Sequence, residues 1–126
     1  MYHLKNPTRA IEFMANCCRR VLFLETCVSF GDQVLLKPCS ENAANPAQAI
    51  SGTGCRPTRR WVYNHLTKYF EFVYLPITQP NHEEFPIDWT SRPPKKILTR
   101  SIFIASRQRI VNALLTQEIP MKQKRH

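Results

Sequence analysis

Three short apolar runs, each followed by polar residues, constrain the fold of this chain more than any other feature of its sequence. They read Val-Leu-Phe-Leu at 21–24, Phe-Val-Tyr-Leu at 72–75 and Ile-Phe-Ile-Ala at 102–105. Apolar runs without polar alternation are typical of strands covered on both faces, as in a parallel sheet flanked by helices. Ligands of such sheets bind beyond the strand ends. The runs therefore predict an α/β fold with its chemistry in the polar residues that follow each strand.

Capping residues and apolar periodicity place a helix before each of the first two runs. Asn6-Pro7 and Pro57 are typical of helix starts, and apolar residues at helical spacing follow both. The helices are predicted over 7–18 and 57–70, and the strands over 20–26, 71–75 and 101–106. This order predicts parallel pairing of the first two strands, whereas the third is free to run antiparallel at an edge. The predicted core consists of Leu22, Leu24, Val62, Leu66, Phe70, Val73, Ile102 and Ile104.

The other segments are predicted as loops and ends of one domain, or of a piece of a larger one. Residues 31–56 read as a long loop with one helical turn, and 76–96 as an irregular loop rich in proline. A short helix is predicted within 107–118. We expect 1–118 to form the α/β domain and 119–126 to form a basic, disordered tail.

Positive charge is concentrated in the carboxyl-terminal third. Residues 1–91 carry nine Lys or Arg and eight Asp or Glu, whereas 92–126 carry nine Lys or Arg and only Glu118. A segment of this kind either binds nucleic acid or another polyanion, or is a solvated end. The absence of aromatic residues after Phe103 argues against stacking on nucleic-acid bases. A non-enzymatic basic binding module that uses 92–126 is therefore one alternative for the function.

The five cysteines have no Cys-x-x-Cys spacing. Buried, reduced thiols of a cytosolic protein explain them best, with a disulfide framework or a zinc site as alternatives. No stretch approaches the ~20 apolar residues of a membrane span, and residues 1–7 lack the apolar region of a signal peptide. We therefore expect a cytoplasmic protein without membrane contact.

Two polar segments are candidates for ligand binding. Glu25-Thr26-Cys27 follows the first run, where Glu25 can bind a ligand's hydroxyl or ammonium group, or only the backbone amides of the next loop. The segment 51–61 leads into a helix start, where its arginines can bind an anion or remain solvated. That segment matches neither the phosphate-binding P-loop nor the dinucleotide-binding glycine motif.

A third segment, 81–89, reads Asn-His-Glu-Glu-Phe-Pro-Ile-Asp-Trp and is a candidate for catalysis. Its histidine and carboxylates can supply a general base or bind a hard metal ion. The spacing matches no zinc motif, and we assign no metal to it. The alternative is a surface loop pinned by Phe85 and Trp89.

Four stretches of the chain together resemble the carboxyl half of an FkbM-type methyltransferase. The stretches are residues 21–31, 52–62, 78–89 and 100–107, and the resemblance covers about residues 18–116. That family uses S-adenosylmethionine on a Rossmann-like, mostly parallel sheet. The resemblance thus implies a partial sheet of this class and methyl transfer to an oxygen of a small molecule or glycan, promoted mainly by positioning.

The resemblance also implies roles for the candidate residues. It assigns cofactor binding to Glu25, Thr26 and Cys27, and catalysis to His82 and Glu83. Binding of the acceptor would fall to Arg56, Arg59 and Glu84.

One departure from the family affects the expected activity. The strand and glycine-rich loop that hold the cofactor in the family have no counterpart before the 21–24 run. We therefore expect a truncated or remnant domain that binds S-adenosylmethionine weakly or not at all and is inactive alone. A sheet cut in this way leaves the 21–27 strand without a neighbour, which predicts dimerisation through that edge, aggregation, or a partner that supplies the missing half.

Overall fold

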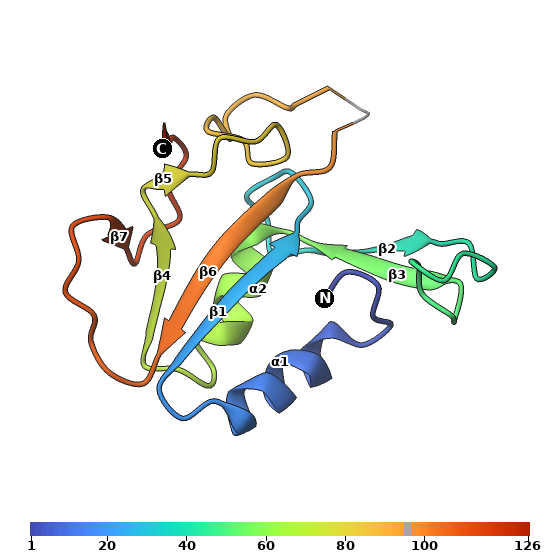
Figure 1. The fold of residues 1–126 in the computed structure, drawn as a ribbon, viewed down its shortest axis with the longest axis horizontal. Helices are drawn as coiled ribbons and strands as arrows, with labels where there is room; N and C mark the ends of the chain where they lie inside the picture. Colours follow the sequence, from blue (N-terminus) through green and yellow to red (C-terminus); the bar gives the residue numbers. More distant parts are fainter. Residues whose placement is uncertain (95–96) are drawn as a thin grey trace.

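The structure is a computed structural model that describes residues 1–94 and 97–126. Within these residues it contains two helices and eight strands (Figure 1). The helices are α1 (Pro7–Cys17) and α2 (Arg59–Leu66). The strands are β1 (Val21–Cys27), β2 (Leu36–Ser40), β3 (Thr53–Pro57), β4 (Phe72–Pro76), β5 (Thr78–Gln79), β6 (Arg100–Ser106), β7 (Leu115–Thr116) and β8 (Lys124–Arg125). Neither helix in the described part of the chain is long and apolar enough to cross a membrane.

The main sheet is antiparallel, so the prediction of a mostly parallel, Rossmann-like sheet is wrong. Its strand order is β1-β6-β4-β7, and β6 runs antiparallel to both of its neighbours. The three predicted strands form close to their expected positions, as β1, β4 and β6, but the third strand is central and separates the first two. β1 and β4 consequently run in the same direction without pairing to each other.

The first apolar run misled the prediction because β1 is covered on only one face, whereas consecutive residues of β4 and β6 are buried on both faces. Helix α2 lies behind β1 and β6 in Figure 1, α1 lies beside the lower part of β1, and the face of β1 and β6 away from α2 is turned toward the viewer. Phe23, in the middle of the first run, is 72% exposed, whereas Leu24 beside it is buried. A one-sided antiparallel sheet usually alternates apolar and polar residues, and β1 keeps apolar residues on its open face instead.

The core lies between the helices and the covered face of the sheet. Ile11 and Ala15 of α1 and Val62 and Leu66 of α2 pack there against strand residues that include Phe103. The predicted core residues Leu24, Val62, Leu66, Phe70, Val73 and Ile104 are buried. Leu22 and Ile102 are only half-buried, and the completely buried Phe103 was not predicted.

The helix starts follow from their capping residues. The side chain of Asn6 accepts a hydrogen bond from the backbone N–H of Arg9 at 3.2 Å, which confirms the predicted start of α1. Helix α2 begins later than predicted, because Thr58 is its N-cap and Pro57 belongs to β3. It ends at Leu66 rather than at residue 70.

Three segments differ from their predicted form. Residues 31–56 contain most of the β2–β3 hairpin rather than a loop with a helical turn. The segment 107–118 forms no helix and contributes β7. Residues 119–126, expected as a disordered tail, include β8, which pairs with β5, and the buried Gln123.

Candidate functional site

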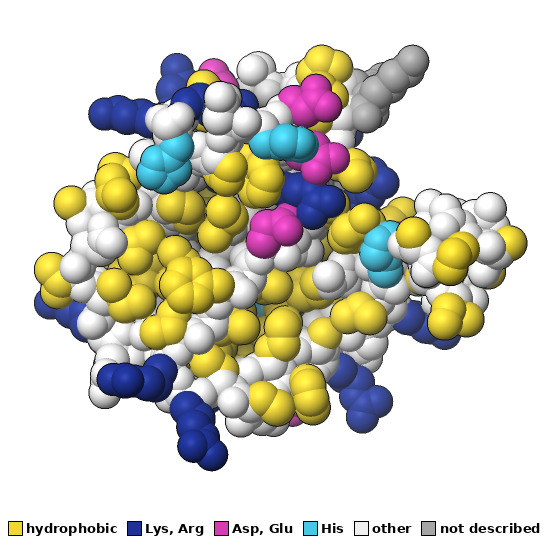
Figure 2. Space-filling view, viewed as in Figure 1, with side chains coloured by type: hydrophobic (Ala, Val, Ile, Leu, Met, Phe, Trp, Pro, Cys, Tyr) yellow, Lys and Arg dark blue, Asp and Glu magenta, His cyan; other side chains and the backbone are white. Residues whose placement is uncertain are grey.

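A pocket of about 460 Å³ opens at the end of β1. Residues 27–30, at and after the end of β1, form one part of its wall, and Lys37–Cys39 of β2 with Arg56 of β3 form a second. The segments 92–94 and 97–99 close the other side. In the space-filling view, an indentation separates the hairpin lobe from the loops above it (Figure 2). The pocket thus joins segments that are far apart in the sequence.

Hydrogen bonds to the chain after β1 hold both walls of the pocket in place. The Ser29 hydroxyl donates to the carbonyl of Arg56 at 3.0 Å, and the Ser29 N–H donates to the carbonyl of Pro57 at 2.7 Å. On the opposite wall, the N–H of Val28 donates to the carbonyl of Thr99 at 2.8 Å. The end of β1 is therefore a rigid support for the hairpin and for the segment that leads into β6.

The charged side chains on the described wall of the pocket are all cationic. They are Lys37, Arg56 and Arg92, and no Asp or Glu lies among the described lining residues. None of these three side chains forms an ion pair or a hydrogen bond with another described residue. Since all three are exposed to solvent, the pocket presents unneutralised positive charge to an incoming ligand.

The hairpin register places two of these cations directly opposite each other. Lys37 and Arg56 are cross-strand partners on β2 and β3. Like charges in this position destabilise an antiparallel pair. An anion bound between them would replace the repulsion with attraction, which makes the pair a stronger indication of a binding site than either residue alone.

The buried cysteine of the pocket, Cys27, favours binding over covalent chemistry. Cys27 and Cys39 both line the pocket. Burial raises the pKa of the Cys27 thiol, and the nearby Arg100 only partly offsets this effect. Because the thiolate is the reactive form of cysteine, a thiol that stays protonated at neutral pH is a poor nucleophile.

The three predicted cofactor-binding residues do not form one site. Cys27 lines the pocket. Glu25 points to the open face of the sheet and accepts a hydrogen bond from Arg100 at 2.9 Å. Thr26 is buried on the covered side, where its hydroxyl donates to the carbonyl of Cys27 at 3.4 Å. Alternation along β1 places Thr26 on the opposite side from Glu25 and Cys27, since consecutive residues of a strand face opposite sides.

Arg100 joins two predicted site residues that sequence reasoning did not connect. Its guanidinium forms ion pairs with Glu25 at 2.9 Å and with Glu84 at 2.5 Å. These hydrogen bonds raise the pKa of Arg100. Glu84 therefore has a partner within the fold. The only signal for this contact in the sequence was the presence of a carboxylate, Glu25, in one predicted strand and of a cation, Arg100, directly before another.

The predicted catalytic residues lie outside the pocket. His82 and Glu83 are exposed in the turn that follows β5. The Nδ1 atom of His82 accepts a hydrogen bond from the backbone N–H of Glu84 at 3.2 Å, and its ring packs edge-on against Phe85. Among the described residues, no three His, Cys, Asp or Glu side chains are grouped so that they could hold a metal ion.

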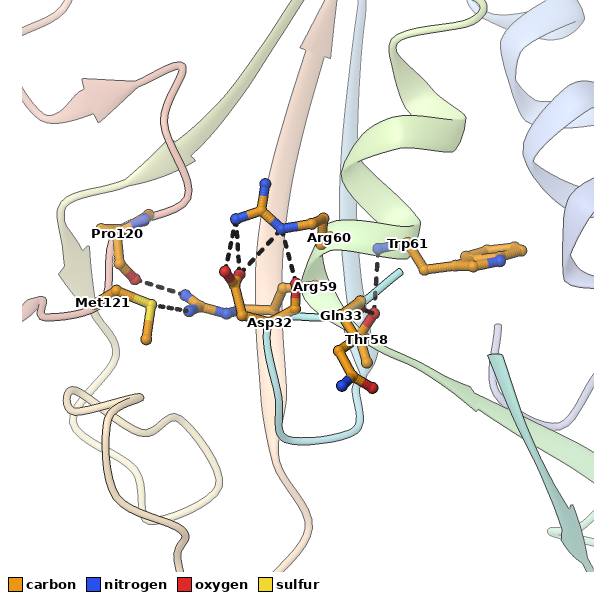
Figure 3. Close-up of polar contacts among 8 residues, drawn as sticks. All are labelled: Asp32, Gln33, Thr58, Arg59, Arg60, Trp61, Pro120 and Met121. Atoms are coloured by element: carbon orange, nitrogen blue, oxygen red, sulfur yellow. Dashed lines mark hydrogen bonds and ion pairs between the residues drawn. The ribbon is translucent and has the colours of Figure 1, made fainter. Parts of the chain in front are cut away.

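The arginines of the 51–61 segment lie in different surroundings. Arg56 lines the pocket, whereas Arg59 is 3% exposed and lies 3.8 Å over the ring of Trp89. Figure 3 shows the hydrogen bond that the Arg59 guanidinium donates to the carbonyl of Pro120 at 2.8 Å. It also shows the hydrogen bonds that Arg60 donates to the carboxylate of Asp32. Burial lowers the pKa of Arg59 to about 10. Arg59 is therefore bound within the fold and is not among the described residues that line the pocket.

Fold and site together define a small protein with two helices on one face of an antiparallel sheet and a basic pocket beside it. No protein family model matches the chain, and comparison with curated proteins and with solved structures finds no match. The resemblance to FkbM-type methyltransferases consequently remains a prediction from the sequence, and the sheet that it implied is not the one in the structure.

Proposed function

We propose that this protein is a binding module for a small anionic ligand, which it holds in the pocket at the end of β1. The observation that carries the proposal is the directly opposed pair Lys37 and Arg56, with Arg92 on the facing segment. A pocket of about 460 Å³ is in the size range of small-molecule sites.

The number and type of the cations favour a phosphorylated ligand. Two guanidinium groups can each donate two parallel hydrogen bonds to phosphate oxygens, and Lys37 adds a compact point charge. The pocket wall also contains Phe30, Pro38 and Leu98, which can contact an apolar part of the ligand. A phosphate ester with an apolar body fits this composition.

The alternative of a polyanion-binding tail receives less support from the contacts of residues 92–126. Arg100 is paired with carboxylates, and Arg107 donates to the carbonyls of Ala15 and Tyr69. Arg125 donates to the carbonyls of Pro80, His82 and Phe85. These side chains hold the fold together, so the excess charge of this segment is only partly available to a partner.

The cysteines indicate in which cellular compartment the protein would work. All five cysteines are free thiols. Free thiols persist in reducing compartments, and on that ground we propose a cytoplasmic protein.

Titration with pyrophosphate tests the pocket, because this probe supplies concentrated negative charge without a specific organic group. We expect Lys37→Ala and Arg56→Ala each to weaken binding at least tenfold, the equivalent of about 1.4 kcal/mol. Lys37→Ala should at the same time raise the stability of the free protein by about 0.2–1 kcal/mol, because it removes the opposed charge. Calorimetry and thermal denaturation measure the two effects.

Lys68→Ala is the matched control, since Lys68 is an exposed cation at the end of α2 and does not line the pocket. It should leave the affinity within about twofold. Absence of pyrophosphate binding, or equal losses in the control and pocket variants, would contradict the proposal.

Titration with S-adenosylmethionine separates this proposal from methyl transfer. The pocket offers cations but, in its described wall, no carboxylate for the positively charged sulfonium and ammonium groups of that cofactor. We expect no measurable binding. Micromolar binding would support the methyltransferase prediction instead.

A further inference from the structure

Strand β1 has a free edge that no described part of the chain covers. It is the outermost strand of the main sheet and pairs there only with β6 (Figure 1). An uncovered edge presents unpaired backbone N–H and C=O groups and can pair with another strand.

The hydrogen bonds at the two ends of the β1–β6 ladder identify the free groups. The N–H of Arg107 donates to the carbonyl of Arg20, and the N–H of Val28 donates to the carbonyl of Thr99. Each of these bonds joins residues that lie directly opposite each other, just beyond the ends of the ladder. The first and last pairs of the ladder, Val21–Ser106 and Cys27–Arg100, are therefore non-hydrogen-bonded pairs. Even-numbered residues of β1 therefore bond to β6, and the odd-numbered residues direct their backbone groups outward.

The open part of this edge extends over three outward residues. Val21, Phe23 and Glu25 are exposed and form no backbone hydrogen bond with any described residue outside the ladder, whereas Cys27, the next outward residue, is buried. Beyond the end of β1 the edge is covered by β3, because the N–H of Ser29 donates to the carbonyl of Pro57. The free stretch is thus symmetric about Phe23.

We propose that this edge pairs with the same edge of a second copy of the chain. In an antiparallel pair related by a two-fold axis at Phe23, each Phe23 lies opposite the other, and Val21 lies opposite Glu25 of the second copy. All three outward residues are then used, and each opposed pair exchanges both of its N–H···O bonds. The main sheets of the two copies become one continuous sheet.

Side-chain chemistry supports a second copy as the occupant. Phe23 is 72% exposed and meets its own equivalent in this register, which removes the most exposed aromatic side chain of the sheet from water. Arg19, two residues before Val21, comes within diagonal reach of Glu25 of the second copy. The edge is therefore complementary to itself in hydrogen bonding, in apolar surface and in charge.

The net charge predicts how this dimer responds to salt. Each copy carries a formal charge of +9 at pH 7. Two such copies repel each other, and added salt screens the repulsion. The dimerisation affinity should accordingly rise with ionic strength, opposite to the behaviour of anion binding in the pocket.

Sedimentation of the full chain from about 1 to about 100 µM tests the proposal. We expect a monomer–dimer equilibrium whose dissociation constant rises at least tenfold in Phe23→Pro and in Phe23→Lys. Proline removes an N–H that points outward, so it is compatible with the ladder to β6. Lysine on an edge strand opposes pairing and keeps the N–H, which covers the case in which the proline variant fails to fold.

Ile50→Lys is the control, because it adds the same charge at an apolar residue that is 91% exposed and lies away from β1 in the hairpin. It should dimerise like the original chain. Hydrogen exchange should show protection of the Val21, Phe23 and Glu25 amides that grows with protein concentration.

A chain that stays monomeric over this range would overturn the proposal and leave the edge to a strand of a different protein. A dimer that persists in both Phe23 variants would overturn it as well, because another surface would then form the interface.

Discussion

Arg56 and Arg59 lie three residues apart, but one side chain is exposed and the other is buried. Arg56 is exposed in the pocket, whereas Arg59 is packed against Trp89 and bound to the carbonyl of Pro120. The start of α2 lies between them and turns the second side chain inward. Both residues read as candidate anion ligands in the sequence, because composition cannot show on which side of a helix start a side chain will lie.

Cys55 provides a pH-dependent prediction at the scale of one residue. Burial raises the pKa of its thiol to about 11 from an ordinary value of 9.0. The folded state thus keeps the thiol protonated at a pH where the unfolded chain ionises. The resulting stabilisation is fully present below about pH 9 and is lost as the pH rises toward about 11.

Chemical denaturation of the original chain and of Cys55→Ala between about pH 7 and about pH 11 measures this effect. The free energy of unfolding of the original chain should fall more steeply above about pH 9 than that of the variant. Parallel curves for the two proteins would show that Cys55 does not contribute to the dependence.

The side chain of Thr58 stabilises both the start of α2 and the turn before β2. Its hydroxyl donates to the carbonyl of Gln33 at 2.5 Å and accepts from the N–H groups of Leu35 and Trp61. Thr58→Ala removes a helix cap and leaves these buried or partly buried groups without a partner. We expect a loss of about 2–3 kcal/mol in the free energy of unfolding, measured with urea.

Two further variants separate capping from the other contacts of Thr58. Thr58→Ser keeps the hydroxyl and should lose less than about 1 kcal/mol. Asn6→Ala removes the exposed cap of α1 and should cost about 1 kcal/mol. An equal effect of the alanine changes at Thr58 and Asn6 would mean that the turn before β2 does not depend on Thr58.

For the molecule as a whole, the carboxyl-terminal segment completes the fold. Gln123 is buried, and its carbonyl oxygen accepts hydrogen bonds from Trp89 at 3.0 Å and from Gln79 at 2.9 Å. Its amide donates to the carbonyl of Pro76 at 2.6 Å. One side chain near the end of the chain thereby connects the end of β4, β5 and the loop that carries Trp89.

Gln123→Ala tests this role directly. The variant loses two buried hydrogen bonds and one partly buried one, and their partners are left unsatisfied. This should cost about 2–4 kcal/mol and lower Tm by roughly 8–15 °C in a protein of this size. Lys122→Ala, a change at the exposed neighbour, should shift Tm by less than about 2 °C. A Gln123→Ala variant as stable as the control would indicate a solvated tail, as the sequence had suggested.

Much of the local structure could be predicted from residues close together in the chain. Asn6 and Pro7 indicated the start of α1, and the apolar runs located β1, β4 and β6. Capping and strand propensity depend on neighbouring residues, so a single sequence carries them. Candidate residues were recognised on the same basis, and two of them, Cys27 and Arg56, do line the pocket.

Contacts between distant segments were decided only by the tertiary structure. The insertion of β6 between β1 and β4, the opposition of Lys37 and Arg56, and the pairing of Arg100 with Glu25 and Glu84 each join residues that no local pattern relates. Strand register determines all of them, and it depends on which faces can be buried together. The sequence by itself therefore determined where α1 and the three apolar strands form, whereas packing determined the remaining short strands, which strands pair and which charges meet.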